Sequence, residues 1–159
     1  MNLIKISIIA ASIAVCATST NAGTGDIPFS GSIGSTCIIN ALSSGTLQVD
    51  ATLQNLNSLA NPATAEVIAT SSGFSLSMDT PSLTRPAADT TPLNSIGGAY
   101  HPISFSGDNS SLVNAFDTTP PQALNAGRVS LNVFFFSGKT GNNIFAEGTY
   151  TADVVLRCE

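Results

Sequence analysis

The feature that most constrains this chain is a period-two alternation of apolar and polar residues, which recurs in short runs. The clearest run lies at 149–158 and places five residues on one face: Tyr150, Ala152, Val154, Leu156 and Cys158. Only Val155 breaks the alternation. Such a pattern predicts a strand with one buried face, and helical periodicity is almost absent from the chain. The sequence therefore predicts an all-β, antiparallel fold.

Further strands are predicted where this pattern recurs between turns rich in Gly, Pro, Asn and Ser. The first run, 27–39, places five residues on one face: Ile27, Phe29, Ile33, Cys37 and Ile39. The other predicted strands are 46–49, 65–70, 73–78, 99–105 and 128–136. Leu53, Leu56 and Leu59 are spaced as in one helical turn, and the proline-containing segments 79–98 and 117–125 are predicted to be extended connections. Six or seven short strands with long crossings indicate a Greek-key sandwich.

The N-terminal segment 1–22 has the pattern of a secretory signal peptide. Lys5 precedes an apolar run at 6–15, small residues follow at 17–22, and cleavage is expected after Ala22. The apolar run is shorter than the roughly 20 residues that a membrane-spanning helix needs. The remaining residues, 23–159, are the size of a single domain. We therefore expect an exported one-domain protein that does not insert into a membrane.

Charge argues against one large class of partners. The sequence holds ten acidic residues against five basic ones, and one of the five, Lys5, lies in the predicted signal peptide. The mature chain is therefore expected to present no cationic surface for phosphate groups. Neither nucleic acid nor an anionic membrane is an expected partner.

Two cysteines fall in phase with the apolar residues of their predicted strands, Cys37 in the first run and Cys158 in the last. Both side chains are therefore expected to point inward, and an exported protein meets an oxidising environment. We predict that they form one disulfide, which ties the first strand to the last. The alternative is a buried free thiol at Cys37 and an intermolecular bond from Cys158.

No motif carries a recognisable catalytic or metal-binding site. His101 is the only histidine, and one histidine among abundant serines does not define a catalytic triad. The aspartates are scattered, whereas metal ligands cluster. The segment 137–140, Ser-Gly-Lys-Thr, has Val133 where a phosphate-binding loop has glycine, so it is predicted to be a hairpin turn. We expect neither an enzyme nor a cofactor nor a metal.

Two segments resemble subunits of the chaperone–usher pilin or fimbrial family, which includes the spore coat protein U-like domains. Residues 29–39, Phe-Ser-Gly-Ser-Ile-Gly-Ser-Thr-Cys-Ile-Ile, resemble the first pilin strand leading into its first cysteine, and Gly45-Thr46-Leu47 follows. At the other end, Gly148-Thr149-Tyr150 opens an alternating strand that runs to the penultimate residue, much as pilins end. The resemblance covers nearly all of 23–159.

The resemblance implies an incomplete immunoglobulin-like Greek-key sandwich, in which six strands leave a groove beside the last strand. A periplasmic chaperone, and then a neighbouring pilus subunit delivered by the usher, would fill this groove by strand addition. The residues expected to line the groove are Tyr150, Ala152, Val154 and Leu156. The chain would then pass through the periplasm and function at the cell surface in a fimbria, adhering to a host or abiotic surface.

Three features depart from the family pattern. The usual pilin disulfide joins the first strand to the second, whereas the predicted second strand at 65–70 has no cysteine. The penultimate residue is usually aromatic, and here it is Cys158. Little sequence precedes the first alternating run after the signal segment. The apolar residues Ile27, Phe29 and Ile33 are therefore either a donor strand for a neighbour or the inner face of the chain's own first strand.

Two functions remain open from the sequence. The first is a structural or adhesive subunit of a surface fimbria, assembled by donor-strand complementation. The alternative is a self-contained secreted β-sandwich that binds a ligand or a host surface without polymerising.

Overall fold

A computed structural model describes residues 30–107 and 121–159, and every element named below lies in the unit Ile33–Glu159. The described residues form strands and no helix, so the all-β prediction is confirmed. The strands are β1 (Cys37–Ser43), β2 (Gln48–Val49), β3 (Asn55–Asn57), β4 (Ala63–Ala69), β5 (Phe74–Met78), β6 (Ser82–Thr84), β7 (Ser95–Gly107), β8 (Gln122–Leu124), β9 (Gly127–Gly138), β10 (Thr151–Asp153) and β11 (Leu156–Cys158). The predicted signal peptide, 1–22, lies outside the described residues and stays a prediction.

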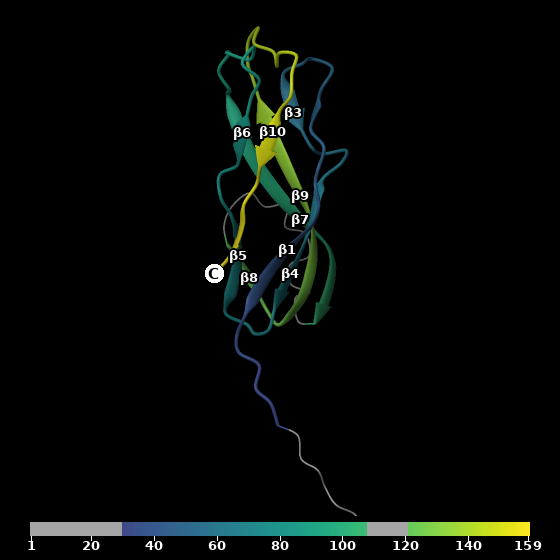
Figure 1. The fold of residues 1–159 in the computed structure, drawn as a ribbon, viewed down its shortest axis with the longest axis vertical. Helices are drawn as coiled ribbons and strands as arrows, with labels where there is room; N and C mark the ends of the chain where they lie inside the picture. The colour runs from purple at the N-terminus through teal and green to yellow at the C-terminus, as the bar shows by residue number, and fades with distance from the viewer. Residues whose placement is uncertain (1–29, 108–120) are drawn as a thin grey trace, which may run out of the picture. The chain divides into compact units, whose positions relative to one another are not determined.

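Strand β9 is the centre of the largest sheet. Along one edge it pairs with β7 over its whole length, and along the other it pairs first with β4 and then with β3. Strand β1 continues the sheet beyond β4, and β2 continues it beyond β3. Two smaller sheets have the orders β11-β5-β8 and β10-β6, and all of these pairings are antiparallel. In Figure 1, β7 and β9 run side by side, and β6 and β10 form a separate pair.

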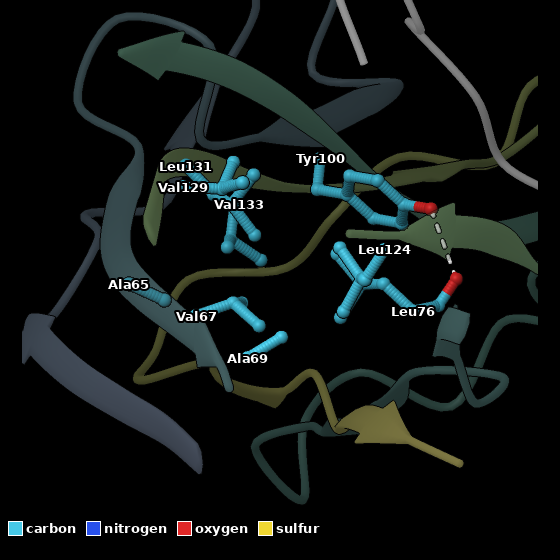
Figure 2. Packing of buried hydrophobic residues seen from close by; sticks show 9 residues of the cluster. All are labelled: Ala65, Val67, Ala69, Leu76, Tyr100, Leu124, Val129, Leu131 and Val133. Atoms are coloured by element: carbon cyan, nitrogen blue, oxygen red, sulfur yellow. Dashed lines mark hydrogen bonds between the residues drawn. The ribbon is translucent and has the colours of Figure 1, made fainter. Parts of the chain in front are cut away.

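The main core lies between the large sheet and the sheet of β5 and β8. Strand β9 contributes Val129, Leu131 and Val133, whose period-two spacing turns all three toward the same side. From the opposing sheet come Leu76 and Leu124, both almost completely buried. Figure 2 shows these side chains facing one another, with the Tyr100 hydroxyl donating to the Leu76 carbonyl oxygen at 3.3 Å. Antiparallel sheets with apolar side chains packed between them are consistent with a β-sandwich.

The first strand is shorter than predicted. The alternation predicts a strand from residue 27, but β1 begins only at Cys37, and residues 30–36 belong to no strand. Ile33 is 88% exposed, and Ile27 and Phe29 lie outside the described residues. The physical reason is that β4, the partner of β1, ends at Ala69, opposite Cys37. Residues 30–36 therefore continue the strand pattern without a strand opposite them, and their contact with the end of β4 is limited to hydrogen bonds with Thr70.

The predicted helical turn at 53–59 is wrong, because those residues form a turn followed by β3. The carboxylate of Asp50 accepts hydrogen bonds from Thr52 and from the backbone N–H groups of Gln54 and Asn55, which closes the turn. Leu53 has a φ of 58° within it. The leucine spacing of three therefore reflects a turn that contains Leu53, followed by a strand in which Leu56 is buried.

The predicted connections and the last strand also differ in detail. The segment 79–98 contains β6 and the start of β7, and the described part of 117–125 contains β8. The last run divides into β10 and β11, separated by Val154 and Val155. Val155, which breaks the alternation in the sequence, is 48% exposed. The break lets the two halves of the run pair with different strands, β6 and β5.

Cys37 and Cys158 form a disulfide, with their Cα atoms 6.2 Å apart and a sequence separation of 121. The bond joins the start of β1 to the end of β11, so the predicted pairing of first and last strands is confirmed. The alternative of a free thiol at Cys37 is wrong for this structure.

The packing of the core predicts how much a cavity there would lower the free energy of unfolding. Replacing Leu76 with Ala removes a fully buried side chain from between the two sheets, so we expect a loss of about 2–5 kcal/mol in the free energy of unfolding. Urea denaturation followed by circular dichroism measures this loss. The matched control is Leu59→Ala, because Leu59 is 57% exposed and its truncation should change stability by less than about 0.5 kcal/mol. Equal losses in both variants would contradict this assignment of the core.

Candidate functional site

A groove lies between β1 and the C-terminal strands of the described chain. Its volume is about 1100 Å³. One wall is formed by β1 and the loop after it, from Ile39 to Leu47, and the opposite wall runs from Tyr150 to Leu156. The second wall alone corresponds to about 20 Å of extended chain. A wall of this length suits an extended peptide segment.

The floor of the groove comes from the large sheet. Alternation on β9 turns Val133 and Phe135 into it, and Ala63 and Ala65 of β4 lie beside them. The small alanine side chains leave depth where larger residues would fill the space. The rim is polar, with Ser43, Ser44, Thr46, Thr151 and Asp153 among the lining residues. The groove therefore combines an apolar floor with a hydrogen-bonding rim.

The groove exists because the strands on its two sides pair away from each other. Strand β1 pairs with β4, β10 pairs with β6, and β11 pairs with β5. In the sheet topology of the described residues, no strand pairing joins β1 to β10 or β11. Two strand edges therefore face the groove, and edges of this kind can pair with an added strand.

The sequence-predicted residues fall at distinct places around the groove. Tyr150, Ala152, Val154 and Leu156 all line it, and each is half-buried. The disulfide of Cys37 and Cys158 lies two residues beyond Ile39 on one wall and Leu156 on the other. Ile33 is not among the lining residues. The role of the first four residues as a strand acceptor stays a prediction.

A buried ionic cluster holds Tyr150 in place. The Lys139 ammonium donates to Asp89 and, at 2.6 Å, to the Thr91 hydroxyl, and it lies 4.6 Å from the centre of the Phe145 ring. The side chains of Lys139 and Asp89 are 0% and 1% exposed. The Tyr150 hydroxyl donates to the other oxygen of Asp89 at 2.9 Å. The cluster therefore ties the chain after β9, and Tyr150 just before β10, to the loop that follows β6.

The cluster shifts the ionisation of its members. Burial alone would raise the pKa of Asp89, but the hydrogen bonds from Lys139 and Tyr150, together with the Lys139 charge, hold that pKa below its ordinary value. Burial, and then the hydrogen bond to Asp89, raise the pKa of Tyr150 to about 12. Asp89 is therefore a carboxylate and Tyr150 a neutral donor at physiological pH, which is the arrangement their hydrogen bond requires.

Sequence reasoning missed this cluster. Residues 137–140 were predicted to form a hairpin turn, but β9 ends at Gly138 and the chain continues to β10, which pairs with β6. Lys139 enters the interior instead of lying at a solvent-exposed turn. Nothing in the sequence indicates that Asp89 is buried and paired, because its partner, Lys139, lies 50 residues away. Only the unusual scarcity of lysine and arginine in the chain could have drawn attention to Lys139.

Comparison with known proteins adds no assignment, since no family model and no curated protein matches this chain. Across residues 30–107 and 121–159, no three potential metal ligands come together. The same residues include no helix long and apolar enough to cross a membrane.

Removing one charge from the buried cluster should be costly. Asp89→Asn leaves the Lys139 ammonium buried without its counter-ion, so we expect the free energy of unfolding at neutral pH to fall by about 3–5 kcal/mol. The matched control is Asp79→Asn, because Asp79 pairs with Arg157 at the surface, where both side chains are well exposed. Denaturant unfolding should show a much smaller loss for the control. Similar losses would mean that the buried pair contributes no more than a surface pair.

The same carboxylate predicts acid sensitivity. Because the folded-state pKa of Asp89 is lowered, its contribution to stability is complete above the ordinary value of 3.8 and is lost as pH falls toward the folded-state value. Thermal melts of the wild-type chain should therefore decline more steeply below about pH 4 than melts of Asp89→Asn. Parallel declines in the two proteins would contradict this role of Asp89.

Proposed function

We propose that this protein is a structural or adhesive subunit of a surface fimbria, and that its groove accepts a β-strand from another polypeptide. The observation that carries the proposal is the elongated groove between two unpaired strand edges, with an apolar floor and a polar rim. Strand addition satisfies both features, because backbone hydrogen bonds form along the edges while alternate side chains enter the floor. A rigid small ligand could contact the apolar floor, but it would leave the backbone groups along the two strand edges without hydrogen-bond partners.

The strand order supports an immunoglobulin-like assignment with one strand missing. In that fold, one sheet has the order A-B-E-D and the other holds C, F and G. Here β1, β4, β9 and β7 follow one another in the large sheet, as A, B, E and D would. Strands β5 and β6 then correspond to C, and β10 and β11 correspond to F. The groove lies on the side of β10 and β11 where strand G would pair.

The N-terminal alternating segment is the proposed donor. Ile27, Phe29 and Ile33 would lie on one face if this segment were paired as a strand, and residues 27–33 span the same number of positions as 150–156. Ile33 is 88% exposed and lies in no strand, so it has no place in the core of the domain that carries it. Burial in the groove of a second copy would remove these apolar side chains from water.

On this proposal, a strand from a periplasmic chaperone occupies the groove first and an usher exchanges it for the donor segment of the next subunit. The protein then functions at the cell surface. Other pilus subunits are its direct partners, and a host or abiotic surface is the partner of the assembled fibre. No step of this assembly requires an enzymatic activity, a cofactor or a metal.

Strand exchange predicts a polymer that resists detergent but not boiling. Surface extracts from cells that produce the wild-type chain with its assembly partners should give a ladder on a denaturing gel without boiling, and a monomer band after boiling. Phe29→Asp should abolish the ladder, because a charge would enter the apolar floor. Ser30→Asp is the matched control and should keep the ladder, because residue 30 alternates to the other face of the donor.

The outcome separates the two functions. A monomer band in both boiled and unboiled wild-type samples would overturn the fimbrial proposal. It would favour the self-contained secreted binding protein.

A further inference from the structure

The groove has one covalently closed end. Its lining reaches Ile39 on β1 and Leu156 on β11, and two residues further along each strand lie Cys37 and Cys158, which are bonded to each other. At this point β1 begins and β11 ends, so the disulfide closes this end of the groove. Among residues 30–107 and 121–159, this is the only disulfide, so at the Leu47 and Tyr150 end the walls have no comparable link.

The disulfide is also the strongest direct connection between the walls. Strand β1 takes its backbone hydrogen bonds from β4, and β11 takes its bonds from β5. Both strands also pack half-buried side chains against the same core cluster, namely Cys37 and Ile39 from β1 and Leu156 and Cys158 from β11. This shared packing involves no backbone pairing between the two strands. Reduction of the bond would therefore leave β11 attached to one small sheet and free to shift relative to β1.

We propose that the Cys37–Cys158 disulfide is the fixed end of the groove, so that only the oxidised chain holds the walls at the separation that an incoming strand needs. This inference rests on the proposed function and assigns it a redox requirement. Formation of the bond in an oxidising compartment completes the acceptor site. A chain that remains reduced is a poor acceptor even when it is folded.

The closed end also fixes the direction of the incoming strand. A donor segment at 27–33 is followed after Ile33 by only three residues before Cys37, where the donor's own domain begins. That domain needs space, and the walls are joined at the disulfide end. The residue nearest the donor's domain, Ile33, therefore lies near Leu47 and Tyr150. Ile27 lies near the disulfide, and the strand runs parallel to β1 and antiparallel to β11.

The test uses a synthetic peptide of residues 23–36 and the purified chain without its signal segment. Fluorescence anisotropy measures peptide binding to the oxidised chain, to the chain reduced with dithiothreitol, and to the variant Cys37→Ser/Cys158→Ser. Far-UV circular dichroism reports whether each form is folded. A peptide carrying Phe29→Asp is the control for binding outside the groove.

We expect the oxidised chain to bind the peptide, and the folded reduced forms to bind it at least about tenfold more weakly. Equal binding by oxidised and folded reduced chains would overturn the redox requirement while leaving the proposed function intact. Failure of the oxidised chain to bind the peptide, or equal binding of the Phe29→Asp peptide, would contradict strand acceptance itself. The two failures are therefore distinguishable.

A second measurement uses only the oxidised wild-type chain, so it tests the role of the disulfide as the fixed end even if the reduced forms unfold. Photoreactive benzoylphenylalanine replaces Ile27 in one peptide and Ile33 in another, and mass spectrometry maps the adducts. Crosslinks from position 27 should fall near Ile39 and Leu156, and those from position 33 near Leu47 and Tyr150. The reverse pattern, or adducts from position 27 beyond the disulfide, would overturn its role as the fixed end.

Discussion

The bond between Cys37 and Cys158 joins two strand edges that share no pairing in the described residues. Closing a loop between residues that are 121 positions apart in sequence restricts the unfolded chain strongly, by an amount on the order of 4–5 kcal/mol from loop-closure entropy. In the folded state, the same bond anchors the small sheet of β11 and β5 to the large one. The separation of the walls at one end of the groove follows from this single constraint.

Strand β9 links the core to the groove. Its inward residues Val129 and Leu131 lie in the fully buried cluster, and Val133 and Phe135 continue the same face into the groove floor. Phe135 belongs to a second buried cluster with Leu56 and Phe145. One alternating strand therefore provides both the stability of the domain and the surface on which an added strand would lie. A change on β9 that weakens the core also alters the groove.

The second wall of the groove, 150–156, is held near its two ends by different kinds of interaction. At one end, Tyr150 is fixed through Asp89 and Lys139, a buried pair whose charges would be costly to separate. At the other, Cys158 is fixed covalently. Between them, Val154 packs against both buried clusters, while Val155 is exposed. Anchoring of this kind lowers the conformational entropy that a wall would lose when a strand binds to it, which is the basis of preorganisation.

The alternation of the sequence determined the all-β class, the inward phase of Cys37 and Cys158 and their pairing, and the residues on one face of 149–158, because side-chain direction in a strand depends only on local period. Tertiary structure decided what depends on partners. Residues 30–36 have a strand pattern but form no strand, because β4 ends at Ala69. Lys139 is buried rather than in a turn, because Asp89 lies opposite it in the fold. The groove is also decided by tertiary structure, because it lies between the strand edges that remain unpaired after the sheets have assembled.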